Sequence, residues 1–282
     1  MMVLRKMVEL VTSEWQQASA WLLIGAIFFA MRSCEYLETN VSEESRRTKI
    51  LRLKNIVFRK NGKHFQHDDA WLHKADLVII TFEFQKNDKR DVSVHMFATE
   101  DKVLCPVVAW ANTVRRVWSY PGSTEDTKVC QFRCPTTGTV SSIQANHVRD
   151  YLRVIVDLIG VDVLGFTSED VGLHSIRSGG AMAMFLSKTS TIIIMRIGRW
   201  SSEAFLEYIR EQVENFTAGV AQNMLQFEHY FLLDRRNVNN INTTKTSKPN
   251  TSIHDNVSGA VEVPFDITFS KLSLEDSARL TR

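Results

Sequence analysis

The feature that most constrains the fold is a run of fourteen residues, Ala18 to Met31, that is almost entirely apolar. It is too short to span a bilayer, which takes about 20 residues in a helix. A signal peptide is also disfavoured, because Glu9 and Glu14 precede the run and Arg32 follows it, where a small-residue cleavage site would be needed. With apolar residues at helical spacing, 8–31 is interpreted as a buried helix that ends near Arg32.

The composition excludes several classes of protein. A hydrophobic content of 44% in 282 residues is enough for a proper core, and a net charge of +2 does not by itself indicate a nucleic-acid partner. Four cysteines in a chain of this length do not make a disulfide framework, and Cys130 and Cys134 have poor spacing for zinc. We therefore expect a chain that needs neither disulfides nor a metal.

Three segments have the residue pattern of strands, and QKNDKR between the last two is typical of a turn. The segments are 50–58, 76–84 and 91–97. Together they predict a small three-stranded antiparallel sheet. The tip of its tight hairpin carries Lys86, Lys89 and Arg90.

Most of the remaining chain is predicted to be helical, so the fold class is α+β and mainly helical. The further helices are expected at 106–118, 142–159, 174–187, 190–197, 202–212 and 214–231. Pro106 suits the start of the first, Ser141 or Ser142 can cap the second, and Gly160 ends it. After Asp234 the sequence becomes polar. We therefore expect a folded domain over 1–233 and a flexible linker and tail over 234–282, mostly disordered.

Positive charge is concentrated in 46–63, which holds eight Lys or Arg and no acid. Such a block can neutralise phosphates, although a solvated basic face has the same pattern. The candidate DNA contacts in the block and at the hairpin tip are Arg52, Lys54, Arg59, Lys60, Lys63, Lys89 and Arg90.

A second polar cluster contains His64, His67 and His73, with Asp68 and Asp69 between them. These residue types can bind a metal. A polar loop between two strands accounts for them better, so no metal site is predicted.

The segment 172–210 contains the residues best suited to catalysis. His174 and Arg177 lie three residues apart at the start of a predicted helix, so both emerge on one face, and a helix N-terminus favours an anion. Gly179 and Gly180 behind them would let another backbone pack closely. Tyr208 follows thirty-one residues after Arg177. This order suits an enzyme that holds a phosphate with arginines and breaks a phosphodiester with a tyrosine.

The phrases AMRSCEY, QKND, HSIRSGG and GRWSSEAFLEYIR, in this order, resemble the tyrosine recombinases, also called the phage integrase family. They are most similar to the eukaryotic branch carried by mobile elements such as Cryptons. The resemblance covers roughly residues 8–232 and implies the family's catalytic fold. It also implies site-specific cutting and rejoining of double-stranded DNA through a 3′-phosphotyrosyl intermediate, by a homotetramer with no metal or small-molecule cofactor. A nuclear location is implied for a eukaryotic host and a cytoplasmic one otherwise, with no membrane association or secretion.

The resemblance also implies roles for individual residues. Arg32 and Arg177 would clamp the phosphate and His174 would hydrogen-bond it. Tyr208 would attack the phosphorus. Lys86 would protonate the leaving 5′-oxygen, and Lys89 competes with it for that role.

The chain departs from the family pattern in two places. The residue nine positions before Tyr208 is usually His or Trp in the family, and here it is Arg199. Either the adjacent Trp200 takes the role of that His or Trp by packing against Tyr208, or Arg199 adds a phosphate contact. Family members also usually carry a helical core-binding domain before the catalytic domain, whereas this chain begins almost at the latter's first helix. We therefore expect weak or absent activity without such a domain. The main alternative is a non-catalytic DNA-binding protein derived from a recombinase, and a type IB topoisomerase is a weaker third.

Overall fold

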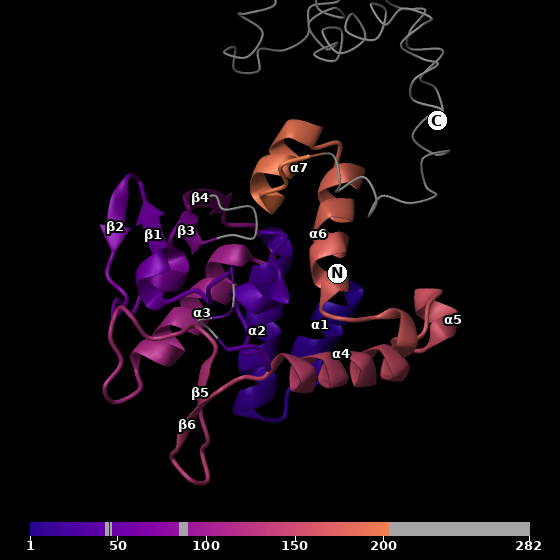
Figure 1. Cartoon of the computed structure of the whole chain (residues 1–282), viewed down its shortest axis with the longest axis horizontal. Coiled ribbons are helices and arrows are strands. Elements are labelled where there is room, and N and C mark those ends of the chain that lie inside the picture. Colours follow the sequence, from indigo (N-terminus) through magenta and orange to yellow (C-terminus); the bar gives the residue numbers. More distant parts are fainter. Residues whose placement is uncertain (43–44, 46, 85–89, 203–282) are drawn as a thin grey trace, which may run out of the picture. The chain divides into compact units, whose positions relative to one another are not determined.

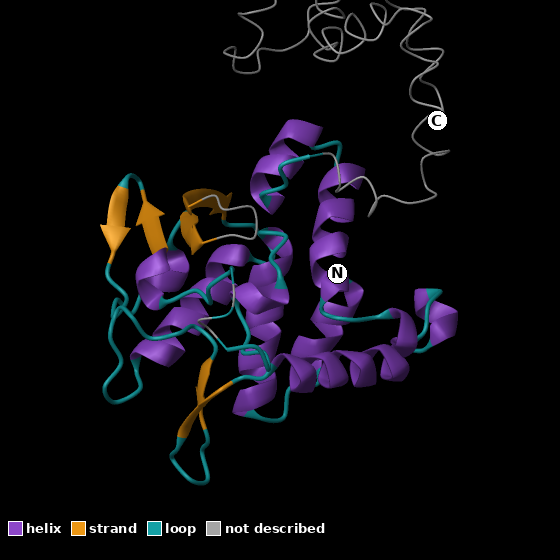
Figure 2. Cartoon of the chain, viewed as in Figure 1, coloured by secondary structure: helices purple, strands orange, loops and turns teal. Residues whose placement is uncertain are grey.

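The computed structural model describes residues 1–42, 45, 47–84 and 90–202, which belong to one compact unit, Met1–Arg210. The described part is α+β and mainly helical, as the sequence predicts (Figure 2). Several predictions lie outside the described residues and are not tested by the structure. They concern the helices expected at 202–212 (of which only Ser202 is described) and 214–231, the tail from residue 234, and the side chains of Lys86, Lys89 and Tyr208.

The apolar helix predicted over 8–31 is two helices, α1 (Met2–Glu9) and α2 (Glu14–Phe28). The break arises from a capping box that the sequence interpretation overlooked. The Ser13 hydroxyl accepts a hydrogen bond from the Gln16 amide at 3.2 Å, and the Gln16 side chain accepts one from the Ser13 amide at 3.2 Å. Residues on all sides of α2 are buried, so it is the central helix of the core, as its apolar sequence requires.

Three helices pack directly on α2 (Figure 1): α1, α3 (Pro106–Trp118) and α6 (His174–Leu186). Glycines permit two of these contacts. A Cβ on Gly25 would lie 2.7 Å from the Trp110 ring of α3, and a Cβ on Gly180 of α6 would overlap the carbonyl oxygen of Ile27. The predicted close approach at Gly180 is therefore confirmed. At Gly179 a Cβ would meet only the Ile27 side chain, at 4.0 Å.

The main sheet has four antiparallel strands in the order β2-β1-β3-β4, one more than predicted. They are β1 (Ile56–Lys60), β2 (Lys63–Phe65), β3 (Leu77–Phe84) and β4 (Arg90–Phe97). The extra strand follows an Asn61-Gly62 turn in which both residues have positive φ, the geometry of a tight hairpin. The strand predicted from residue 50 begins only at Ile56, because Leu53–Asn55 is a 3₁₀ turn in which the Asn55 side chain accepts a hydrogen bond from the Arg52 amide.

The segment that follows α3 contains a second hairpin, β5 (Gln131–Arg133) with β6 (Val140–Ser142). Ser141 and Ser142 therefore lie in a strand, and Gln144 occupies the N-cap position of α4 (Ala145–Ile159). Gly160 ends α4 as predicted, with a φ of 90°, and the short α5 (Val161–Leu164) follows. The four cysteines all lie within the described residues and form no disulfide bond.

Helices α6 and α7 (Thr191–Gly198) contact one another and complete the described fold. Both agree closely with the helices predicted at 174–187 and 190–197. Among residues 1–202, as far as they are described, no helix is long and apolar enough to cross a membrane.

Candidate active site

The site is built around the C-terminal end of α2. The carbonyl groups at a helix C-terminus lack partners within the helix and carry partial negative charge. Here the Phe29 carbonyl accepts a hydrogen bond from Arg199 at 3.1 Å, and the Ala30 carbonyl accepts one from Arg177. These bonds bring α6 and the end of α7 to the segment that follows α2 and leads to Arg32.

Arg32 is held by a carboxylate from its own turn. Its Nη1 donates to Glu35 Oε1 at 3.1 Å, and its backbone amide donates to Glu35 Oε2 at 2.8 Å. The Glu35 side chain has no exposed surface, whereas 24% of the Arg32 side chain is exposed. Arg32 is thus anchored at one edge while part of it reaches solvent.

Arg199 completes the pairing of Glu35 from the other side. Its Nη2 donates to Glu35 Oε2 at 2.6 Å, its Nη1 also donates to the Ile197 carbonyl at 2.9 Å, and its guanidinium lies 3.6 Å from the centre of the Phe82 ring. Burial lowers the pKa of Arg199, and the charge of Glu35 opposes that shift. A left-handed backbone at Arg199, with φ of 58°, ends α7 and turns this side chain inward.

Arg177 is also buried, with 2% of its surface exposed. Its Nη2 donates to the Gly198 carbonyl at 2.8 Å, and its guanidinium lies 4.1 Å from the centre of the Trp200 ring. The ring passes so close to Gly198 that any Cβ there would overlap it. Gly198 thus allows Trp200 to stack on Arg177, a cation–π arrangement that also covers one face of the guanidinium.

His174 begins α6 and is exposed. Partial burial lowers the pKa of its imidazole, and the positive charges of Arg177 and Arg32 lower it further. A lowered pKa favours the neutral imidazole near pH 7, which can donate one hydrogen bond and accept another.

Five of the seven residues predicted for catalysis lie on the segments that meet at the end of α2: Arg32, His174, Arg177, Arg199 and Trp200. The other two, Lys86 and Tyr208, lie outside the described residues. The sequence interpretation missed Glu35. Its signal was an acid three residues after an arginine at the end of an apolar helix, within the same phrase AMRSCEY.

The candidate DNA contacts that the structure describes form two groups. Arg52 and Lys54 contact an acidic turn: Arg52 donates to the Asp126 carbonyl at 2.7 Å, and Lys54 pairs with the Asp126 carboxylate at 2.8 Å and with Glu83 at 3.4 Å. The others lie on the sheet. Arg59 and Lys60 end β1, Lys63 faces Lys60 across the hairpin, and Arg90 opens β4 with its guanidinium 5.1 Å from the centre of the Phe84 ring.

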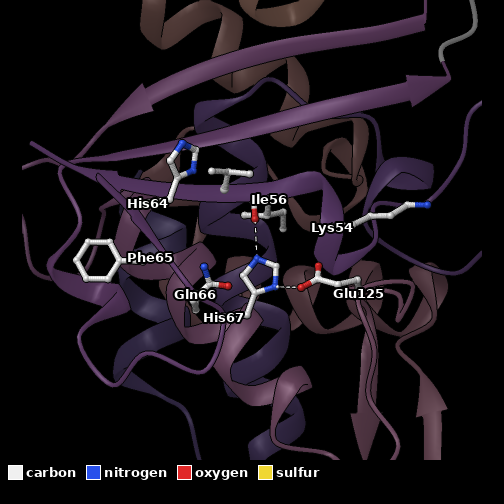
Figure 3. Close-up of a pocket in the computed structure, with 8 residues that line it drawn as sticks. Lys54, Ile56, His64, Phe65, Gln66, His67 and Glu125 are labelled. Atoms are coloured by element: carbon white, nitrogen blue, oxygen red, sulfur yellow. Dashed lines mark hydrogen bonds and ion pairs between the residues drawn. The ribbon is translucent and has the colours of Figure 1, made fainter. Parts of the chain in front are cut away.

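The histidine cluster does not gather around a common point. His64 lies in β2 and His73 in a 3₁₀ turn, while His67 lies between them in sequence with only 9% of its side chain exposed. His67 contacts the Ile56 carbonyl at 2.8 Å and Glu125 at 3.2 Å, beside an open pocket of about 470 Å³ (Figure 3). Within the described residues no three potential ligands are placed to hold a metal ion.

The sequence matches no protein-family profile and no curated protein. Two solved structures of the XerH site-specific recombinase are similar in fold, one bound to difH substrate in a pre-cleavage complex and one bound to palindromic difH substrate in a post-cleavage complex. The first shares 16% identity with a TM-score of 0.43 over 76% of this chain, and the second 17% with 0.46 over 78%. The chain spans about half the length of these proteins, covering 49% and 50% of them. A likeness this distant says nothing about chemistry, which rests on the residues described above.

Proposed function

We propose that this chain is a site-specific DNA recombinase of the tyrosine recombinase class, which cuts and rejoins DNA strands through a tyrosine. The observation that carries the proposal is the hydrogen bond from Arg177 to the Ala30 carbonyl, which brings the helix that begins with His174 to the segment that holds Arg32, about 140 residues away in the sequence. Cationic groups on the same segments as an imidazole suit a phosphate that gains charge during reaction.

The proposed reaction uses Arg32, His174 and Arg177 together with two residues assigned from the sequence, Tyr208 and Lys86. The Tyr208 hydroxyl attacks the phosphorus and forms a P–O bond, while the bond to the 5′-oxygen breaks. Lys86 gives its proton to that oxygen, and His174 receives the tyrosine proton. Because tyrosine has a pKa of about 10 and is a poor nucleophile when protonated, Arg32 and Arg177 must stabilise charge on the phosphate. Attack by the 5′-hydroxyl on the phosphotyrosyl bond reverses each step and rejoins a strand.

The proposal extends to the organisation of the protein. Residues 1–233 form the catalytic domain, and 234–282 are a linker and tail. The partner is double-stranded DNA, which the protein binds as a homotetramer. The location is the nucleus in a eukaryotic host and the cytoplasm in any other host. The exposed Lys60 and Lys63 at the tip of the β1–β2 hairpin are available to phosphates, and each such contact contributes to salt-dependent binding.

The test is covalent capture of DNA by the full chain. Nicked duplexes of randomised sequence let the cleaved end diffuse away, so that a protein–DNA adduct accumulates and can be recovered by phenol partition and sequenced. We expect adducts from the wild type and from Tyr230→Phe, the matched control, and none from Tyr208→Phe, which should still bind DNA. Recovery no greater than that of Tyr208→Phe would overturn the enzymatic proposal.

A second candidate is a non-catalytic DNA-binding protein with the same fold. It is favoured by one observation: Arg177 is 2% exposed and bonded to the carbonyls of Ala30 and Gly198, as a purely structural arginine would be. This candidate predicts salt-dependent binding to the same duplex library with no adduct under any condition.

A further inference from the structure

The sequence left open whether Arg199 contacts the phosphate, but the Arg199 side chain has no exposed surface. Its Nη1 donates to the carbonyls of Phe29 and Ile197, its Nη2 donates to Glu35, and the Phe82 ring lies against its guanidinium. To reach a phosphate, Arg199 would have to leave these partners and strand the Glu35 carboxylate in the core. It is therefore not a phosphate ligand in this arrangement.

We propose that Arg199 is a positioning residue that sets the orientation of Arg32 through Glu35, an inference that rests on the proposed function. Glu35 Oε2 accepts from Arg199 Nη2 at 2.6 Å and from the Arg32 amide at 2.8 Å, which leaves Oε1 to accept from Arg32 Nη1 at 3.1 Å. The carboxylate is fixed at one oxygen by Arg199 and directs Arg32 with the other. Of the two arginines, Arg32 is the one with exposed surface, and its guanidinium is thus oriented before DNA binds.

Burial explains why the second arginine is required. A carboxylate with no exposed surface is costly unless it is paired and hydrogen-bonded, and Arg32 alone is partly solvated. Without Arg199, the buried Glu35 carboxylate loses one of its two cationic partners and favours rotation toward solvent, a change that releases Arg32 Nη1. The same guanidinium ties the end of α7 to Phe29, so a simple structural role is the competing explanation.

The deciding experiment is a double-mutant cycle between Arg199→Met and Arg32→Ala in the full chain, read by the rate of adduct formation on the captured DNA. A misplaced catalytic group costs about 100-fold, so Arg199→Met should slow the wild type by about that factor. In the Arg32→Ala background it should add less than about 3-fold, because Arg32 is no longer there to be aimed. A further loss near 100-fold in that background would overturn the proposal.

Two additions keep the test decisive. Arg199→Lys retains the charge but lacks the planar guanidinium fork that spans Phe29, Ile197 and Glu35, so it serves if the Met variant fails to fold, with an expected loss of about 10-fold that also vanishes without Arg32. Arg196→Met, on the exposed face of α7, is the matched control and should leave the rate unchanged.

A readout that needs no catalysis separates failure of this proposal from failure of the proposed function. Arg32 lowers the pKa of His174, so an NMR titration of His174 reports where the Arg32 charge lies. Arg199→Lys should raise the His174 pKa when Arg32 is present, and should leave it unchanged in the Arg32→Ala background. An unchanged His174 pKa in Arg199→Lys would overturn the positioning role even if no adduct ever forms.

Discussion

Replacing Gly180 with alanine probes the close packing of α6 on α2 that brings His174 and Arg177 to the end of α2. A Cβ at this position would overlap the backbone oxygen of Ile27, below the 3.0 Å under which real Cβ contacts are not found. Because the obstacle is backbone, the helices must move apart, and overpacking of this kind costs about 1–3 kcal/mol. Alanine returns about 0.8–1 kcal/mol of helix propensity. The overlap is severe, so we expect a net loss of about 1–2 kcal/mol.

Gly179 supplies the matched control, because a Cβ there meets only the Ile27 side chain, at 4.0 Å. Gly179→Ala should therefore raise stability by up to about 1 kcal/mol. Urea unfolding followed by circular dichroism measures both variants, and the midpoints should move in opposite directions. If Gly180→Ala is as stable as Gly179→Ala, the described contact between α6 and α2 is wrong, and with it the placement of His174 and Arg177.

Three further predictions concern the site itself. The pKa of His174, measured by NMR, should lie below the usual histidine value of about 6.5 and should rise in Arg32→Ala. Because the pKa is lower in the folded state, the contribution of His174 to the free energy of unfolding is complete above the unfolded-state pKa and is lost as pH falls through the folded-state pKa. A His174 pKa above 6.5 would contradict this account. Gly198→Ala should push Trp200 off Arg177, changing the fluorescence of that indole, with Trp200→Phe to identify its signal; an unchanged spectrum would refute the stacking. Glu35→Ala should lower the free energy of unfolding by about 3–5 kcal/mol, because it leaves the buried Arg199 without its carboxylate, and a loss under about 1 kcal/mol in urea would contradict that pairing.

Much of the fold follows from local sequence signals. The hairpin formed by β3 and β4, the start of α3 at Pro106 and the end of α4 at Gly160 all follow from strand periodicity, proline and glycine. The errors occurred where a short polar motif interrupts a longer pattern. Ser13 and Gln16 divide the apolar helix, and Asn61-Gly62 turns the basic block back on itself to form β2.

The candidate site was less accessible to sequence reasoning. The prediction that Arg32, His174 and Arg177 share a site came from the resemblance of the phrases around them to the tyrosine recombinases. Burial could not be predicted in the same way. The inward direction of Arg199 depends on a left-handed residue at the end of α7, and the role of Glu35 depends on two arginines that approach it from different segments. Such tertiary pairings leave no periodic trace in the sequence.

The most direct test of the central claim is to identify the amino acid and the DNA end joined in the captured adduct. Nuclease trimming and proteolysis followed by mass spectrometry should give a peptide containing Tyr208 linked to a 3′-phosphate, with a free 5′-hydroxyl on the departing strand. Attachment at any other residue, or linkage through a 5′-phosphate, would contradict the proposed arrangement of Arg32, His174 and Arg177 around a phosphate attacked by Tyr208.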